Sequence, residues 1–273
     1  MSAPIDPAGV DSYPRHRDAM PPTRQRSGRY TLRFAQDQHD LDRITKLRFE
    51  VFNLEIGEGL RSAWERCRDE DEFDPHCHHL MVTTGADKQG EEEVVGTYRM
   101  QTFAMAHSGR GFYSDDEFDL SALEPILPQA VELGRACIAR EHRNQRVLFL
   151  LWRGLAAYVS ANDMRYFFGC CSLTGQDPVE ANKVHEHLIE TGSQHADWQA
   201  PTRPAYRVPT VSKQAPAARD GAVEIPPLMQ LYLDYGARIV SPPAIDSRFN
   251  TIDFLALFDV ASLNQRVRRM FFE

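Results

Sequence analysis

The fold is decided by residues 130–173, which read AVELGRACIAREHRNQRVLFLLWRGLAAYVSANDMRYFFGCCSL. The runs Ala130–Ala139 and Tyr166–Leu173 have the composition of strands. Val147–Ala161 between them is apolar on nearly all sides, which is typical of a buried helix. A strand, a helix and a second strand in this order predict two parallel neighbouring strands joined by a crossover. The segment therefore indicates an α/β domain.

The segments on either side extend this sheet. Tyr30, Leu32 and Phe34 alternate with polar residues, which predicts a strand over Arg29–Gln36. Apolar residues recur at helical spacing over residues 40–55, and the glycines at 57 and 59 end that helix. The other elements that we expect are a hairpin of His79–Thr84 and Glu93–Phe103, a helix-containing flap over Gly109–Pro128, a helix from the N-cap Asp177 to about Glu190, a short helix over Pro226–Tyr235, and strands over Ala237–Pro242 and Thr251–Asp259.

This pattern predicts a mixed central sheet flanked by helices, in one α/β domain over residues 29–273. Residues 1–28 carry prolines among charged residues, so we expect a flexible tail there. Residues 192–227 contain several prolines together with glycine, serine and glutamine, which predicts a long loop.

The bulk composition limits the class of protein. The 273 residues are 42% hydrophobic and 26% charged, which is typical of a globular protein with a sizeable core. The net charge of −8 is opposite to that of a nucleic-acid-binding domain, so no nucleic acid partner is expected. No run reaches the roughly 18 apolar residues of a spanning helix, and the first thirty residues resemble neither a signal peptide nor an anchor. The five cysteines show no disulfide spacing, which favours a cytoplasmic location.

A basic turn precedes the buried helix. It contains Arg140, Arg143 and Arg146, with Asn144 at the helix start. Exposed amides and the positive end of the helix dipole form an anion site at a helix N-terminus, and arginines can grip a phosphodiester. The turn lacks paired glycines, so a nucleotide-type phosphate loop is not supported. A solvated basic turn without a ligand is the alternative.

Glu132 is the candidate general base. Burial beside apolar residues would raise its pKa and suit it to accept the proton of an attacking amine. Arg135 is three positions further along the strand, so a regular strand would place the two side chains on opposite faces. The alternative for Glu132 is a structural ion pair with Arg99 or Arg135.

Charged residues upstream complete the candidate site. Asp71 and Asp74 can bind a cationic amino group or cap a helix, and Arg48 can pair with them. The alternative is a solvated acidic run.

Two cysteine-containing groups are not expected to carry chemistry. His76–His79 with Cys67 matches no standard zinc spacing, so we expect no metal. Cys170 and Cys171 end a strand without a partner histidine placed by the sequence, so we interpret them as buried small hydrophobic residues.

The order of the short motifs resembles that of known enzymes. Arg48-x-x-Val51-Phe52, Asp71-x-x-Asp74, Gly96-x-x-Arg99 and Glu132-x-x-Arg135 together are similar to the acyl-homoserine-lactone synthases. A fuller resemblance, over about residues 30–263, is to the ornithine-lipid type, or hemolysin-like, N-acyltransferases. It is carried by Asp69–Asp74, Gly96–Arg99, Glu132–Arg135, Leu151–Leu155, Gly169–Leu173 and Phe249–Phe254.

The resemblance implies the GCN5-related N-acyltransferase (GNAT) fold. It also implies transfer of a long, often 3-hydroxylated, acyl chain from acyl carrier protein to the α-amino group of an amino acid, ornithine first among them, giving a lyso-aminolipid. The donor is then a phosphopantetheine thioester, no cofactor is bound, and any contact with the inner membrane is peripheral. We therefore expect Glu132 to be catalytic. The carrier and its arm are expected to bind Arg140, Arg143, Asn144 and Arg146, and the substrate to bind Arg48, Asp71, Asp74, Arg99 and Arg135.

Three further expectations accompany this interpretation. An apolar tunnel for the acyl chain is expected from Phe103, Phe112, Tyr113, Phe118, Phe167 and Phe168, with ordinary core packing as the alternative. An enzyme of the same fold that makes an acyl-amino-acid or acyl-homoserine-lactone signal is the second candidate function. A non-enzymatic membrane-active protein is the third, and the acidic charge and the absence of a strongly amphipathic segment disfavour it.

Overall fold

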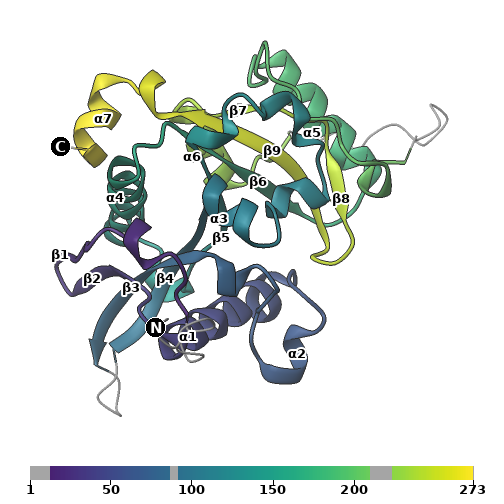
Figure 1. The fold of residues 1–273 in the computed structure, drawn as a ribbon. Coiled ribbons are helices and arrows are strands. Elements are labelled where there is room, and N and C mark those ends of the chain that lie inside the picture. Colours follow the sequence, from purple (N-terminus) through teal and green to yellow (C-terminus); the bar gives the residue numbers. More distant parts are fainter. Residues whose placement is uncertain (1–12, 87–91, 210–222, 273) are drawn as a thin grey trace, which may run out of the picture.

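A mixed sheet forms the centre of the computed structural model, which describes residues 13–86, 92–209 and 223–272 (Figure 1). Within these ranges the strands lie in the order β1-β2-β3-β4-β5-β6-β9-β7, with β8 paired to β9. Their bounds are β1 Gln25–Ser27, β2 Tyr30–Phe34, β3 His78–Ala86, β4 Glu92–Thr102, β5 Ala130–Ile138, β6 Tyr166–Thr174, β7 Arg238–Ile239, β8 Ala244–Asp246 and β9 Thr251–Asp259.

Helices cover both faces of the first half of the sheet. Side chains alternate between the two faces of a strand, and β3 follows this rule. Leu80 and Val82 pack in the cluster that contains helix α4, whereas Met81 packs against Ile44 of helix α1. The helix bounds are α1 Gln38–Phe49, α2 Ala63–Arg66, α3 Phe103–Ser108, α4 Gln145–Ala161, α5 Pro178–Glu190, α6 Pro227–Asp234 and α7 Gln265–Phe272.

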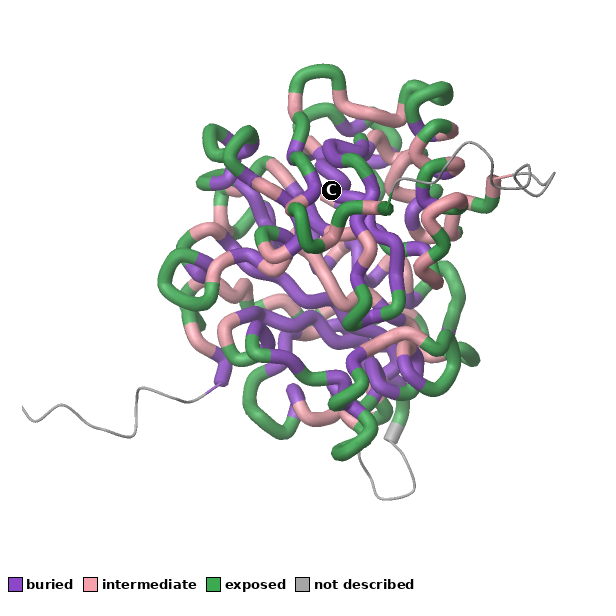
Figure 2. Tube along the Cα trace, turned by 90° about the vertical axis from the view of Figure 1, so that its right-hand side faces the viewer, coloured by how far each residue is buried: buried purple, intermediate pink, exposed green. Residues whose placement is uncertain are grey.

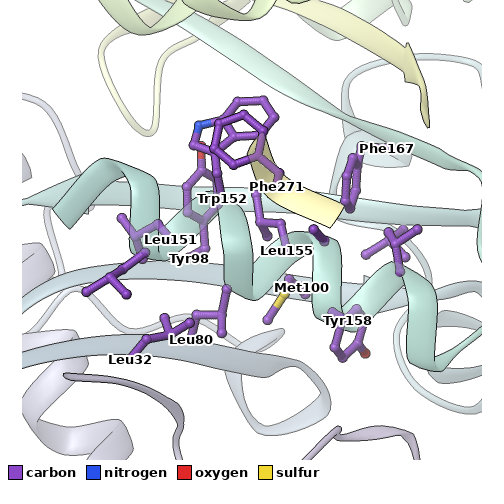
Figure 3. Packing of buried hydrophobic residues seen from close by; sticks show 14 of the residues in the cluster. Leu32, Leu80, Tyr98, Met100, Leu151, Trp152, Leu155, Tyr158, Phe167 and Phe271 are labelled. Carbon is purple, nitrogen blue, oxygen red and sulfur yellow. The ribbon is translucent and has the colours of Figure 1, made fainter. Parts of the chain in front are cut away.

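Helix α4 is the centre of the main core cluster (Figure 3). Trp152 lies against Phe271 of α7 with ring centroids 5.3 Å apart. Gly154 allows the helix to approach the sheet closely, because a β-carbon there would lie 2.8 Å from the methyl groups of Leu80. The buried segments run through the strands in the middle of the molecule (Figure 2). The apolar composition of this helix therefore reflects packing on several sides.

The predicted crossover is confirmed. β5 and β6 are parallel neighbours, and α4 connects them. The other strand pairs are antiparallel, including β3 with β4 and β6 with β9. The sheet is therefore mixed, as the sequence predicts.

Local signals place most helix ends. Asp177 caps α5, accepting a hydrogen bond from the backbone nitrogen of Val179 at 2.8 Å. The helix expected over residues 40–55 consists of α1 followed by a π-helical segment, Glu50–Ile56, and Gly57 ends it in the left-handed conformation, with φ of 79°. The hairpin of β3 and β4 is also confirmed.

The expected flexible tail over residues 1–28 needs a correction. Strand β1 pairs with β2, and the Tyr13 side chain is buried, with its hydroxyl 2.9 Å from Nδ1 of His79. The Ala19 carbonyl accepts a hydrogen bond from Asn162, the residue that follows α4, at 2.8 Å. The composition of this segment does not predict its order, because contacts with residues far away in the sequence hold it in place. Residues 1–12 lie outside the described residues.

Other differences concern the C-terminal third. The short strand β8 and the helix α7 were not expected. The loop expected over 192–227 lies partly outside the described residues, and its described part includes the short 3-10 helix Pro204–Tyr206 and a bridge from Thr202 to Phe118. Among the described residues, no helix combines the length and apolar character needed to cross a membrane.

Candidate active site

A cavity opens where the two parallel strands part. β5 and β6 pair only between Ala130–Glu132 and Tyr166–Phe168. A β-carbon at Gly169 would lie 2.1 Å from the carbonyl oxygen of Leu133, so this glycine allows the two backbones to touch at the point of separation. The cavity has a volume of about 350 Å³. Its largely apolar lining includes Tyr98, Leu133, Trp152, Leu155, Phe167, Phe168, Met229, Tyr232 and Phe258.

A β-bulge brings Glu132 and Arg135 to the same cavity. In the register of β4 and β5, Thr97 faces Cys137 and Arg99 faces Gly134, so β5 has one extra residue between them. Arg135 has φ of 50° there, and the extra residue reverses the alternation of side chains. The expectation that Glu132 and Arg135 lie on opposite faces is therefore wrong.

Glu132 is held by the flap that covers the sheet. Its Oε1 accepts a hydrogen bond from the backbone nitrogen of Ser114 at 2.7 Å, and its Oε2 accepts one from Tyr113 at 3.0 Å. Burial raises the pKa of Glu132 above its ordinary value, although these two hydrogen bonds act against the shift. A carboxylate has about four acceptor positions, so the side chain can accept further hydrogen bonds within the cavity that it lines.

The alternative interpretation of Glu132 as an ion-pair partner is not observed. Arg99 and Arg135 instead pair with Asp71, through Nη1 at 2.6 Å and Nη2 at 2.8 Å respectively. Within the described ranges, no ion pair joins Glu132 to either arginine. The carboxyl group of Glu132 therefore has no directly paired cation among the described residues.

The arginines and aspartates form a closed network behind the cavity wall. Arg48 donates to Oδ1 of Asp69 at 2.6 and 2.8 Å and to Oδ1 of Asp74 at 2.7 Å. Arg99 also reaches Oδ1 of Asp74 at 3.0 Å. Three positive and three negative side chains thus compensate one another: Arg48, Arg99, Arg135, Asp69, Asp71 and Asp74.

The network is internal rather than exposed. Arg48 and Asp74 have no exposed surface. Burial disfavours the charge on Asp74, but the positive charges of Arg48 and Arg99 outweigh this and hold its pKa well below its usual range. Asp74 therefore remains ionised at neutral pH.

The predicted substrate residues separate into two groups. Arg99 and Arg135 line the cavity, whereas Arg48, Asp71 and Asp74 do not. The two carboxylates point to arginines of the chain and do not reach the cavity wall, so they are not placed to bind a cationic amino group. This is a correction to the expected direct contact. Asp69, which belongs to the same acidic run, was missed as a member of the network.

The basic turn lies at the surface, at the start of α4. Asn144 is the N-cap, and its Oδ1 accepts hydrogen bonds from the backbone nitrogens of Arg146 at 3.0 Å and Val147 at 3.3 Å. Arg143 forms a two-point ion pair with Glu55, at 2.7 and 2.8 Å. Arg140, Arg143 and Arg146 are all exposed. Of the predicted carrier residues, Asn144 thus has a structural role and Arg143 is partly neutralised.

The expected aromatic tunnel is formed only in part. Tyr113, Phe167 and Phe168 line the cavity. Phe103, Phe112 and Phe118 instead belong to a separate core cluster, packed with residues such as Leu123 and Leu255. Aliphatic and aromatic residues of α4 and α6 take their place along the cavity.

The histidine and cysteine groups have structural contacts. Nδ1 of His78 is 2.8 Å from the Tyr158 hydroxyl, and Nε2 of His79 is 3.2 Å from Asp74. Burial raises the pKa of the Cys170 thiol well above its usual range, so it is poorly suited to act as a nucleophile. Cys171 is buried as expected, whereas Cys170 is half-buried, and both line the cavity.

Three buried acids beside the cavity were not anticipated. Glu117, Asp246 and Asp253 each offer a carboxylate oxygen, and these oxygens all lie within 4.8 Å of one another. Asp253 also lines the cavity. Asp253 lies within the Phe249–Phe254 motif, whereas Glu117 and Asp246 lie in no motif. Only the fold brings the three residues together.

Comparisons with known proteins bear on the family and the fold of the chain. A family model described as Acetyltransferase (GNAT) domain matches residues 47–153. An L-ornithine N(alpha)-acyltransferase of Agrobacterium fabrum is 32% identical over 251 residues, covering 88% of this chain and 84% of that protein. The corresponding enzyme of Brucella abortus is 31% identical over 249 residues, covering 88% of each. Among solved structures, FeeM, an N-acyl amino acid synthase from uncultured soil microbes, matches with a TM-score of 0.51 at 8% identity, over 87% of this chain and 95% of that one, which supports the fold alone.

Proposed function

Since the chain belongs to the L-ornithine N(alpha)-acyltransferase family, we propose that it transfers a long acyl chain, often 3-hydroxylated, from acyl carrier protein to the α-amino group of ornithine. The product is a lyso-aminolipid. The chain is an acyltransferase with a GNAT fold. We take its catalytic domain to begin at about residue 13, because β1 and the segment before it pack on the sheet.

The observation that carries the proposal is the cavity between β5 and β6 with Glu132 in its wall. An acyl chain requires an apolar enclosure, and residues of α4 and α6 provide one. Trp152 and Leu155 contribute from α4, and Met229 and Tyr232 contribute from α6. The thioester carbonyl then lies near the backbone of β5, where Glu132 and the donor's reactive carbon meet.

Glu132 acts as the general base in this mechanism. The α-amino nitrogen attacks the thioester carbonyl carbon and its proton passes to Glu132, directly or through water. The tetrahedral intermediate then collapses, the carbon–sulfur bond breaks, and the thiolate of the carrier arm takes the proton. Backbone N–H groups of the strand after Glu132 are suited to stabilise the oxyanion. The hydrogen bonds from Tyr113 and Ser114 fix the orientation of the base.

Arg135 and Arg99 are assigned to the acceptor's α-carboxylate. Both line the cavity, and arginine binds carboxylates in a two-point geometry. The Arg135 guanidinium lies 4.0 Å from the centroid of the Phe249 ring, which fixes its plane. Arg48, Asp71 and Asp74, together with Asp69, are assigned to positioning these two arginines rather than to substrate contact.

The carrier protein is assigned to the basic turn. Arg140 and Arg146 are exposed at the N-terminus of α4, where the helix dipole also favours the phosphate of the carrier arm. Arg143 contributes less, because Glu55 already pairs with it.

Peripheral contact with the inner membrane from the cytoplasmic side is part of the proposal. Ile56, which lines the cavity, is 38% exposed, and Leu54 and Trp64 nearby in the chain are each 57% exposed. An amphiphilic product must leave for a lipid phase, and exposed apolar side chains favour that transfer.

The decisive experiment is reconstitution with purified components. The protein is incubated with 3-hydroxyacyl carrier protein and ornithine, thiol release is followed, and the product is identified by mass. We expect N-acylornithine. S-adenosylmethionine replaces ornithine in a parallel reaction, and acyl-homoserine lactone formed there would favour the signal-synthase alternative. Lysis of lipid vesicles without any thiol release would favour the membrane-active alternative.

A further inference from the structure

Glu117, Asp246 and Asp253 form a buried acidic group that is paired with no basic side chain among the described residues. The side chains are 1%, 1% and 3% exposed. Both carboxylate oxygens of Glu117 and Oδ1 of Asp253 have no hydrogen-bond partner among the described residues. Asp246 accepts only from the Arg248 backbone nitrogen at 2.7 Å and the Tyr113 hydroxyl at 3.3 Å. Buried carboxylates without partners are strongly destabilising unless a cation or proton compensates them.

The buried carboxylates of the arginine–aspartate network provide a comparison within the same chain. There, Asp69, Asp71 and Asp74 are balanced by three arginines. Within the described parts of the chain, no lysine, arginine or histidine forms an ion pair with the acidic group. Burial raises the pKa of Asp253 to about 6, and burial together with the other two acids raises that of Glu117 well above its ordinary value. Without a cation beside them, these carboxyl groups therefore favour their protonated form, and a bound cation would restore their charge.

The acidic group lies one tyrosine away from the general base. Tyr113 donates its backbone N–H to Glu132 and its hydroxyl to Asp246. Tyr113 and Asp253 both line the cavity, as does Thr251, whose hydroxyl donates to Asp253 at 3.2 Å. Glu132, the proposed base for the α-amino group, therefore lies at the backbone end of Tyr113. The acidic group lies at its hydroxyl end.

We propose that Glu117, Asp246 and Asp253 bind the side-chain ammonium of the acceptor and thereby select a basic amino acid over a neutral one. The inference rests on the proposed function and assigns specificity within the same site. The two amino groups of ornithine are separated by the chain Cα–Cβ–Cγ–Cδ, which is suited to span the length of a tyrosine. An ammonium has three N–H donors, one for each carboxylate.

A divalent metal ion fits the group less well. Calcium and magnesium require six or more oxygen ligands, usually with several waters. The three carboxylates are almost fully buried, and Asp253 lines the largely apolar cavity. An ammonium carried on an apolar stem fits this environment better.

The test compares ornithine with norvaline, which has the same carbon chain without the side-chain amino group. Values of kcat/KM are measured with acyl carrier protein as donor for the wild type, Asp253→Asn and Glu117→Gln. We expect the wild type to have a higher kcat/KM for ornithine than for norvaline. Each variant should lower this ratio roughly 10- to 100-fold, because a hydrogen bond to a charged group contributes about that much. The rate with norvaline should be retained. The variants should also melt at a higher temperature near neutral pH, because each removes a buried carboxyl group whose ionised form is disfavoured in the folded state.

The matched control is Asp115→Asn. Asp115 is exposed on the same flap, paired with Arg203 at 2.5 Å, and its loss should leave the preference unchanged. Equal use of both acceptors by the wild type, or an equal loss for both in the variants, would overturn the inference. So would an ornithine preference that a chelator abolishes and magnesium or calcium restores. Failure to acylate any amino acid would instead refute the proposed function, and this inference with it.

Discussion

Replacing Glu132 with glutamine should slow acyl transfer by on the order of 10²–10⁴-fold, which is the usual contribution of a positioned general base. The amide cannot accept the amine proton. Its shape is close to that of the carboxylate, so the cavity and the acyl-chain site should be retained. The loss should therefore appear in kcat more than in the KM for the acyl donor.

The same substitution should also lower stability, and the structure gives the size of the effect. Both oxygens of Glu132 accept a backbone N–H, from Ser114 and Tyr113. A glutamine amide has only one oxygen, so one buried N–H loses its acceptor, at a cost of about 1–3 kcal/mol. A catalytic Glu132 and a purely structural one both predict a lower melting temperature, so that measurement does not separate them.

The pH dependence does separate them. Burial raises the pKa of Glu132, and the base acts when ionised, so wild-type kcat/KM should rise as pH rises through that pKa. Above neutral pH, free amine accumulates and needs less help from a base. The ratio of the wild-type rate to the variant rate should therefore decrease as the pH approaches the pKa of the amine. A structural role predicts a ratio that does not change with pH.

The assay is thiol release from acyl carrier protein across this pH range, with folding checked by circular dichroism. Glu124→Gln, on the exposed part of the flap, is the matched control and should keep wild-type rates. A folded Glu132→Gln enzyme with wild-type kcat at neutral pH would refute the catalytic assignment.

Three further outcomes follow from the charged groups. Arg48→Met should destabilise the fold by about 3–5 kcal/mol in denaturant titrations, because it leaves the buried network with one uncompensated negative charge; an unchanged midpoint would contradict the network. The double charge reversal Arg140→Glu, Arg146→Glu should raise the KM for acyl carrier protein and weaken its salt dependence, and identical salt profiles would argue against docking there. The folded-state pKa of Asp253 is about 6, above its ordinary value of 3.8. The native state therefore binds more protons than the unfolded state, so stability should fall as pH rises through about 6, less so in Asp253→Asn; an equal fall in both would contradict the assignment.

The sequence predicts those parts of the fold that local pattern controls. Alternation in Tyr30–Phe34 and the cap at Asp177 depend on near neighbours, and both are found as expected. The parallel pair of β5 and β6 follows from the strand–helix–strand order of residues 130–173.

The sequence did not predict the features that depend on contacts between residues far apart in the chain. A regular strand period gives no sign of the extra residue at Arg135, because a bulge depends on the register of the neighbouring strand. Tyr13 was assigned to a tail because its neighbours are prolines and charges, although its partner is His79. Glu117 and Asp253 are far apart in sequence and share no motif, so their proximity depends on the flap closing over β9.

The arginine–aspartate network has a consequence for assembly. Its six charges come from separate parts of the chain: α1, the acidic run after α2, β4 and β5. Removing one member leaves an unpaired buried charge, whereas the complete set is neutral. We therefore expect the network to form cooperatively in a late step of folding. The cavity wall then acquires its final shape only after all of these segments have packed together. Hydrogen exchange during refolding, with protection of β5 arriving together with that of α1, is the observation that this hypothesis requires.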